Sequence, residues 1–90
     1  MAEPRYNMHS GQWEMAEPSW VLTYGVVNDR FRFAPPGSRP GYNVVTGGFS
    51  VAPKNATPQY NLPEDRWDLA PDGWEPVYNP VTGRWEMVPK

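Results

Sequence analysis

Cysteine is absent from this 90-residue chain, and histidine occurs once, as His9. Without thiols the chain has no disulfide framework and no thiolate metal site. With a single imidazole, few of the residue sets that support acid–base, nucleophilic or metal-assisted catalysis are available. We therefore expect a protein that is not an enzyme and that uses no cofactor or metal, with His9 as a solvated residue at the tip of a turn.

Long apolar runs and a strong net charge are also missing. No stretch approaches the ~20 apolar residues of a membrane span. The opening Met1-Ala2-Glu3-Pro4-Arg5 is not followed by the apolar region of a secretory signal. The net charge of −2 does not indicate the basic face that nucleic-acid binding usually needs. We therefore expect no membrane partner, no nucleic-acid partner and no export by a signal peptide.

Proline and aromatic residues are abundant. The chain has 12 prolines, 8 glycines, five Trp and five Tyr. Proline and glycine favour extended or irregular chain, whereas Trp and Tyr supply much of the burial energy of packed structure. This combination is typical of short ordered units joined by stiff connectors.

An 18-residue repeat organises the whole sequence. All five tyrosines share one frame: Tyr6, Tyr24, Tyr42, Tyr60 and Tyr78. An aromatic residue follows each tyrosine after seven positions, and an apolar residue stands two positions later. The aromatic residues are Trp13, Phe31, Phe49, Trp67 and Trp85, and the apolar ones are Met15, Phe33, Val51, Leu69 and Met87. The frame predicts an N-terminal arm at residues 1–5 and a single array at 6–90, with repeats 6–23, 24–41, 42–59, 60–77 and 78–90.

Each repeat carries a turn signal in its middle. The pairs are Ser10-Gly11, Asn28-Asp29, Thr46-Gly47, Glu64-Asp65 and Thr82-Gly83. Such pairs suit two-residue hairpin turns, with Glu64-Asp65 as the weakest because Pro63 removes a ladder donor. In the last repeat this turn pairs Tyr78 with Met87. Since side chains alternate along a strand, Tyr78, Trp85 and Met87 would share an aromatic face opposite a mostly polar one.

The segments between the hairpins are rich in proline. Residues 35–41, 53–58 and 71–76 cannot continue a hydrogen-bonded ladder, whereas residues 20–27 indicate one longer strand. The predicted fold is all-β: five tandem hairpins joined by Pro-rich extended connectors, without helix, and partly extended along a partner. Trp20 and Trp74 hold the same offset within their repeats, which indicates closer packing of those two connectors.

A lone hairpin is marginal in water, so its aromatic face must bury against something. Either neighbouring repeats stack on one another, or each hairpin lies on a partner; we expect the partner. The residues expected at a partner surface or between repeats are Tyr6, Trp13, Met15, Trp20, Tyr24, Phe31, Phe33, Tyr42, Phe49, Tyr60, Trp67, Leu69, Trp74, Tyr78, Trp85 and Met87. Stacking of these rings on sugars or on peptide prolines is the alternative.

Charged residues recur beside these aromatic positions. Glu14, Asp68 and Glu86 share one offset, which resembles a paired-carboxylate site but is better interpreted as an exposed polar face. Arg30, Arg66 and Arg84 share another. They would either form cross-strand ion pairs, which contribute little when exposed, or contact an acidic partner.

Two repeat families share features with these motifs. The string YNPVTGRWEMVP, with Gly73-Trp74-Glu75 upstream, resembles the second hairpin and closing Trp-x-x-Pro of WW domains, which bind proline-rich peptides. The 18-residue aromatic hairpin also looks like the choline-binding repeats of bacterial surface proteins, whose stacked hairpins hold ligands between aromatic rings. These resemblances imply a carbohydrate- or peptide-binding repeat module.

Small size, repeated hairpins and the lack of a catalytic set are similar to what decoration, or cement, proteins of phage heads and tails show. This resemblance implies a structural protein of a virion or of a cytoplasmic assembly, which clamps neighbouring major capsid or tail subunits. Linked weak contacts would give it high avidity. A homo-oligomer is the alternative partner arrangement.

Overall fold

A computed structural model describes all residues, 1–90. It contains ten strands and a single 3₁₀ turn. Consecutive strands pair antiparallel into five separate two-stranded sheets, hairpins 1 to 5. Their strands are β1 (Glu3–Asn7) and β2 (Gln12–Ala16), β3 (Val21–Gly25) and β4 (Arg30–Ala34), β5 (Arg39–Asn43) and β6 (Gly48–Ala52), β7 (Thr57–Asn61) and β8 (Arg66–Ala70), β9 (Trp74–Asn79) and β10 (Arg84–Pro89). The 3₁₀ turn η1 spans Leu62–Glu64. The prediction of an all-β chain of five tandem hairpins is confirmed.

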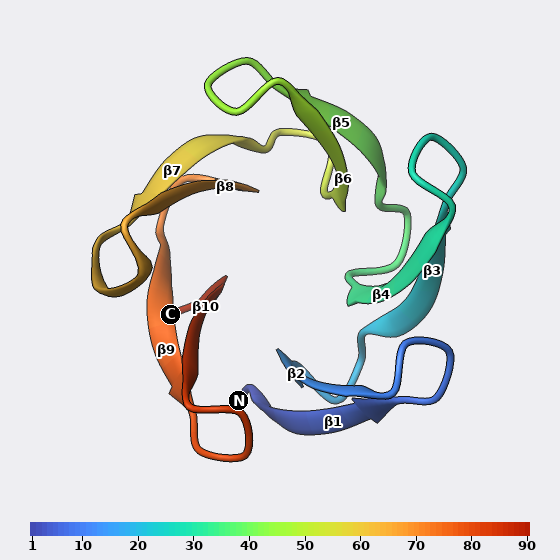
Figure 1. Ribbon diagram of the computed structural model, residues 1–90, viewed down its shortest axis with the longest axis vertical. Helices are drawn as coiled ribbons and strands as arrows, with labels where there is room; N and C mark the ends of the chain where they lie inside the picture. The colour runs from blue at the N-terminus through green and yellow to red at the C-terminus, as the bar shows by residue number, and fades with distance from the viewer.

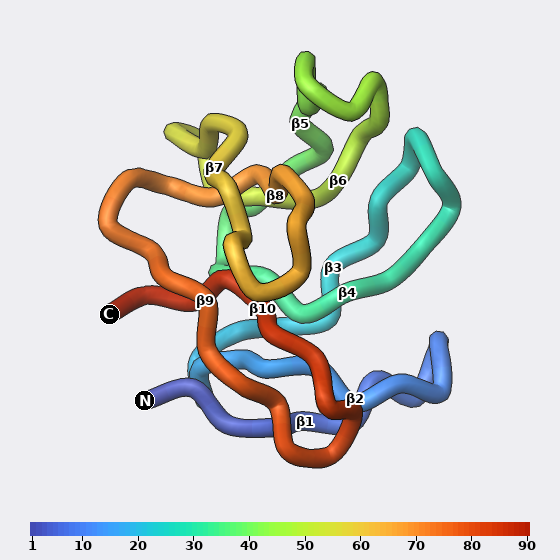
Figure 2. Tube along the Cα trace, turned by 60° about the vertical axis from the view of Figure 1, so that its left-hand side comes forward, coloured from blue at the N-terminus to red at the C-terminus, as the bar shows by residue number.

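The five hairpins form a closed ring rather than an extended array. Figure 1 shows the even-numbered strands around the centre, the odd-numbered strands outside them and the hairpin tips at the periphery. β10 of the last hairpin contacts β2 of the first, as β2 contacts β4, and the two termini lie at the same side of the ring (Figures 1 and 2). The molecule measures 29 × 27 × 19 Å. The expectation of a chain partly extended along a partner is wrong, because the repeats pack on one another.

The proline-rich connectors are tight turns, not extended spacers. In each one a backbone N–H donates to the carbonyl three residues earlier: Trp20 to Glu17, Ser38 to Pro35, Ala56 to Pro53, and Trp74 to Pro71. Gly37 and Gly73 have φ of 86° and 91°, the left-handed region that a type II turn requires at its third residue. Proline fixes φ near −65° and so favours the start of such turns rather than a long polyproline spacer.

The hairpin loops contain four residues, so the predicted two-residue turns and their register are wrong. The N–H of Gly83 donates to the carbonyl of Asn79 at 2.8 Å, and Tyr78 pairs with Trp85 instead of Met87. This register differs from the predicted one by two residues. Because side chains alternate with period two, the change leaves the predicted division into two faces intact.

The last loop residue adopts a left-handed conformation in every hairpin. It is glycine in three of them, and Asp29 and Asp65 in the other two, with φ of 56° and 53°. The Tyr24 hydroxyl donates to the carboxylate of Asp29, and the Tyr60 hydroxyl donates to that of Asp65. These hydrogen bonds raise the pKa of both phenols. A short polar side chain tolerates this backbone region, and here the tyrosine holds it in place.

Two local expectations differ from the structure. Residues 20–27 were expected to form one strand, but β3 ends at Gly25 because the loop of hairpin 2 begins at Val26. Residues 1–5, expected as an N-terminal arm, include the first residues of β1, and the N-terminal ammonium lies 3.1 Å from Glu17 Oε1.

The prolines inside the outer strands cost no ladder hydrogen bond. Pro4 pairs with Met15, whose N–H points away from β1 and donates to Glu86. The pair is therefore one of the non-hydrogen-bonded pairs of an antiparallel ladder, in which the missing N–H of proline would face outward. Pro40, Pro58 and Pro76 occupy the equivalent places.

The core lies near the seam where the first and last hairpins meet. Met15, Ala16, Trp20, Phe33 and Val88 form one buried cluster. The alanine or valine at or next to the end of each inner strand is buried in all five hairpins: Ala16, Ala34, Ala52, Ala70 and Val88. Small side chains there let neighbouring hairpins approach closely around the centre of the ring.

Candidate functional site

Buried asparagines join four of the five hairpins to the next one around the ring. The side-chain amide of Asn79 donates to the Trp13 carbonyl at 3.1 Å and to Glu86 Oε2 at 3.0 Å. Its oxygen accepts from the N–H groups of Val81 and Thr82. One fully buried side chain thus caps its own loop and closes the ring onto hairpin 1. Buried asparagines at the equivalent position are Asn7, Asn43 and Asn61.

The carboxylates of the inner strands complete these junctions. Glu86 Oε1 accepts from the N–H of Met15 at 3.1 Å, and Glu14 Oε1 accepts from the N–H of Phe33 at 3.0 Å. An Asn–Glu pair therefore offers the free edge of the next inner strand one donor and one acceptor, as a neighbouring strand would. Glu14 and Glu86 were expected on an exposed polar face. They instead lie half-buried between hairpins, where they satisfy an otherwise unpaired strand edge.

Asp68 and the arginines behave differently from the expectation. Asp68 Oδ2 accepts from its own Asn61 at 3.3 Å, and it forms an ion pair with Arg66 of the same strand at 3.1 Å. Its side chain is one methylene shorter than glutamate and makes no bond to hairpin 5. Cross-strand ion pairs were expected for Arg30, Arg66 and Arg84, and none of the three forms one.

Glu86 lies in an environment that disfavours its charge. Burial raises the pKa of its carboxyl above the ordinary 4.5, and the nearby Glu14 adds to that increase. The hydrogen bonds from Asn79 and Met15, together with Arg32, oppose it. The folded protein therefore holds a proton on Glu86 at pH values where the unfolded chain has lost it.

We expect the stability contribution of Glu86 to fall as the pH rises. A raised folded-state pKa means that the native state binds more protons between 4.5 and that pKa, so the free energy of unfolding decreases across this window. The measurement is urea unfolding of the wild type and Glu86→Gln from pH 4 to 7. The difference, wild type minus variant, should become smaller with rising pH.

The exposed Glu75→Gln variant controls for the loss of one negative charge. A wild-type minus Glu86→Gln difference that grows with pH would contradict the expectation. It would mean that the hydrogen bonds from Asn79 and Met15 outweigh the cost of burying the charge.

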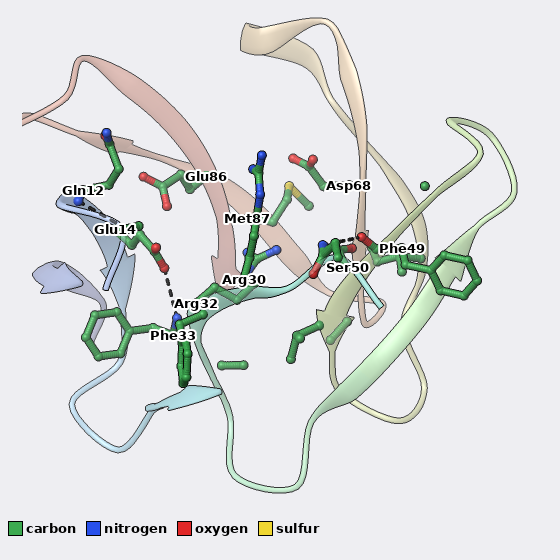
Figure 3. A pocket seen from close by; sticks show the side chains of 18 of the residues that line it. Gln12, Glu14, Arg30, Arg32, Phe33, Phe49, Ser50, Asp68, Glu86 and Met87 are labelled. Carbon is green, nitrogen blue, oxygen red and sulfur yellow. Dashed lines mark hydrogen bonds between the residues drawn. The ribbon is translucent and has the colours of Figure 1, made fainter. Parts of the chain in front are cut away.

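A cavity of about 870 Å³ occupies the centre of the ring, between the inner strands. Charged and polar side chains line it, among them Arg30, Arg32, Ser50, Asp68 and Glu86, and Figure 3 shows these side chains around the cavity. Apolar residues also line it: Trp20, Phe33, Val51, Leu69, Trp74 and Met87. The sequence alone does not indicate that ring closure brings these inner-strand positions around one space.

The predicted aromatic surface divides into buried and exposed parts. Met15, Trp20 and Phe33 are buried, whereas Phe31, Leu69, Trp74 and Met87 are half-buried. Each tyrosine packs on the aromatic residue opposite it, with ring centroids 5.0 to 5.4 Å apart. The five tyrosines stay 39% to 54% exposed, and Trp13, Phe49, Trp67 and Trp85 are exposed as well. Contacts between repeats therefore bury only part of the aromatic face, and the buried asparagines that join the hairpins lie on the opposite face.

Two further ring contacts cross between repeats. Trp20 and Trp74 stack with centroids 5.3 Å apart and an interplanar angle of 19°. The two connectors that share this tryptophan therefore meet each other. His9, at the tip of hairpin 1, stacks on Phe31 of hairpin 2 at 4.0 Å and 15°. His9 is an exposed loop residue, as expected, but it also covers one face of the neighbouring aromatic ring.

Aliphatic side chains are exposed at every hairpin tip. Met8, Val26, Val44 and Leu62 are at least 70% exposed, and Val81 occupies the tip of hairpin 5. The peripheral surface thus combines an aliphatic tip with a tyrosine–aromatic pair five times around the ring.

Other classes of site and relationship give negative findings. No group of three His, Cys, Asp or Glu residues is arranged to hold a metal ion, and no helix is long and apolar enough to cross a membrane. Comparison with models of protein families, with curated proteins and with solved structures finds no match.

Proposed function

We propose that the chain is a non-enzymatic docking module, which binds protein subunits of a larger assembly through the five tips of its ring. The observation that carries this proposal is the repeated apolar tip, an exposed aliphatic residue beside a half-exposed tyrosine–aromatic pair. Soluble monomers rarely display large apolar patches without a partner. Tyr, Trp and Met are also enriched in protein–protein interfaces.

The structure of the junctions supports a surface role for these residues. The hairpins are held together by buried asparagines, carboxylates and small apolar residues, so the tips are not needed to close the ring. Aliphatic side chains such as Val26 and Val44 add burial energy against a protein but offer little to a sugar ring. Five linked contacts of modest strength give high avidity when the target surface repeats.

The more specific form of this proposal is a decoration or cement protein on the major capsid or tail subunits of a virion. Its support is the small ring, the five repeated tips and the absence of a catalytic constellation in the sequence. Self-association into a homo-oligomer would use the same tips. Measuring the oligomeric state of the isolated chain distinguishes this alternative from binding to virion subunits.

Sedimentation of large particles from the native source of the protein tests the proposal. We expect the wild type to co-sediment with particles, and a quadruple variant (Met8→Ser, Val26→Ser, Val44→Ser and Leu62→Ser) to remain in the supernatant. Each exposed substitution should change the free energy of unfolding by less than about 0.5 kcal/mol. Lys54→Ser with Asn55→Ser, on an exposed connector, is the matched control. A wild type that never sediments, or a quadruple variant that sediments equally well, would overturn the proposal.

Binding of a carbohydrate or a proline-rich peptide is the second candidate. The stacking of His9 on Phe31 favours it, because that contact shows that the inner-strand aromatic position accepts a flat ring. Trp13, Trp67 and Trp85 present exposed rings at the same position. Titration with glycans and proline-rich peptides should change tryptophan fluorescence, and Trp67→Ala should reduce that change. A broad panel without any response would remove this candidate.

A further inference from the structure

Three arginines of the central cavity lack hydrogen-bond partners, whereas its acidic residues have them. Arg30, Arg32 and Arg84 line the cavity, and their guanidinium groups take part in no hydrogen bond or ion pair within the chain. Every acidic residue of the lining accepts hydrogen bonds from the protein. These residues are Glu14, Asp29, Asp68 and Glu86. With Arg66, which pairs with Asp68, the lining holds as many arginines as acidic residues, and the three arginines without partners are free cationic donors.

The junction between hairpins 2 and 3 carries a cation where two other junctions carry a glutamate. At two junctions a glutamate accepts from a backbone N–H of the next inner strand, Glu14 from Phe33 and Glu86 from Met15. The equivalent of these glutamates in hairpin 2 is Arg32, which has no acceptor atom. The Glu14–Phe33 contact spans 19 residues, and the same offset from Arg32 leads to the N–H of Val51, which holds in its hairpin the position that Met15 holds in hairpin 1. No side chain accepts from Val51, and the edge carbonyl of Phe49 is satisfied by Asn28.

This sector of the cavity combines positive charge with open space. Arg30 and Arg32 are two residues apart on β4, so they project from the same face of the strand. The equivalent residues of β6 are Gly48 and Ser50, whose side chains are the smallest at these positions. Figure 3 shows Arg30, Arg32 and Ser50 around the same part of the cavity. Arg32, Gly48 and Ser50 depart from the acidic or arginine pattern of the other repeats, and the ring brings them together with Arg30 in this sector.

We propose that the central cavity binds a small organic carboxylate with an apolar or aromatic body. Its carboxylate accepts from the Val51 N–H and from the Arg32 guanidinium, with Arg30 nearby. It thereby takes the place that Glu14 and Glu86 fill with their own carboxylates at two other junctions. The arrangement of those two glutamates is what selects a carboxylate among oxyanions.

The rest of the cavity suits the apolar body of such a ligand. Trp20, Trp74, Leu69 and Met87 contribute apolar lining on the side of the inner-strand ends. A volume of about 870 Å³ falls in the range of small-molecule sites. A charge-assisted hydrogen bond from arginine to carboxylate is stronger than a neutral one, so the anionic group fixes the orientation while the rings supply contact area.

Titration of the purified chain with phenylacetate, followed by calorimetry and tryptophan fluorescence, tests this site. We expect saturable one-to-one binding, and binding of the neutral phenylacetamide weaker by about tenfold or more. Arg32→Gln should weaken phenylacetate binding by a similar factor, whereas Arg84→Gln, the matched control elsewhere in the lining, should change it less than about twofold. Arg32→Glu introduces the acid that hairpins 1 and 5 carry at this position, so it should abolish binding without lowering the midpoint of thermal unfolding.

Several results would overturn the proposal. Equal binding of phenylacetate and phenylacetamide would exclude a carboxylate site. Equal binding of phenylacetate, acetate and sulfate would show general attraction of anions to arginine rather than a shaped site. Unchanged phenylacetate binding by Arg32→Glu would place the ligand elsewhere. Because this assay uses the isolated chain and residues inside the ring, its failure leaves the docking role of the tips untouched.

Discussion

Asn79→Asp is expected to lower the free energy of unfolding by about 3 kcal/mol or more at neutral pH, because it places an uncompensated charge in a buried junction. The substitution keeps the shape of the side chain and the oxygen that caps Val81 and Thr82. It replaces the amide group by an oxygen that faces the Trp13 carbonyl and the Glu86 carboxylate. Two attractive contacts thus become repulsive at the one junction that no connector spans.

Chemical denaturation with two matched substitutions isolates this effect. Asn55→Asp, in an exposed connector turn, should change the free energy of unfolding by less than about 0.5 kcal/mol. Asn43→Asp should cost less than Asn79→Asp, because the inner strand of its hairpin carries Ser50 where hairpin 5 carries Glu86. The loss at Asn79 should also shrink as the pH falls, since a protonated aspartate regains a donor. Equal losses at Asn43 and Asn79, or a loss independent of pH, would contradict this explanation.

The repeat made the hairpins predictable but left their register open. The period fixes the strand order, and the alternation of side chains assigns residues such as Tyr78 and Trp85 to one face for either loop length. The choice between a two-residue and a four-residue loop depends on a tertiary detail. Asn79 caps two N–H groups of the longer loop, and its amide is needed by the neighbouring hairpin. Turn propensity alone favours the shorter loop, because Thr82-Gly83 is a suitable pair for the centre of a two-residue turn.

The ring itself could not be derived from the pattern. An asparagine follows the tyrosine in four of the five repeats, and this signal was visible but was treated as part of a polar face. Its role becomes clear only when a second hairpin supplies the carbonyl that its amide needs, as Trp13 does for Asn79. The cavity depends on ring closure in the same way. Arg32 and Ser50 take the place of the acidic residue in hairpins 2 and 3, and only the ring places them in adjoining sectors of one space.

The expectation of a partner-supported fold failed for a physical reason. It assumed that the aromatic face must be buried for the hairpins to be stable. The junctions instead bury the paired asparagines and small residues of the opposite face, and only Met15, Phe33 and Val51 are buried on the aromatic face. Buried polar groups of this kind cost little when every donor and acceptor is satisfied. The tyrosine–aromatic pairs and the aliphatic tips therefore remain at the surface, where they can serve a partner.

Trp20→Ala is expected to lower the free energy of unfolding by about 3–5 kcal/mol, the usual cost of removing a large buried aromatic side chain. Trp20 is buried in the core cluster with Met15 and Phe33, and its ring stacks on Trp74. The loss is a large fraction of the roughly 5–15 kcal/mol that a small domain possesses. Because this stack joins the connectors before hairpins 2 and 5, its removal loosens the ring on both sides of the seam.

A double-mutant cycle with Trp74→Ala separates the ring stack from simple burial. The sum of the two single losses in unfolding free energy should exceed the loss in the double variant by about 0.5–1.5 kcal/mol, the range measured for aromatic pairs. Trp67→Ala removes the same side chain from an exposed position, and it should cost less than about 2 kcal/mol because little apolar surface returns to water. Additive losses at Trp20 and Trp74 would mean that the two connectors are stabilised separately. A loss at Trp67 as large as that at Trp20 would place the stabilising aromatic contacts at the periphery of the ring rather than at its seam.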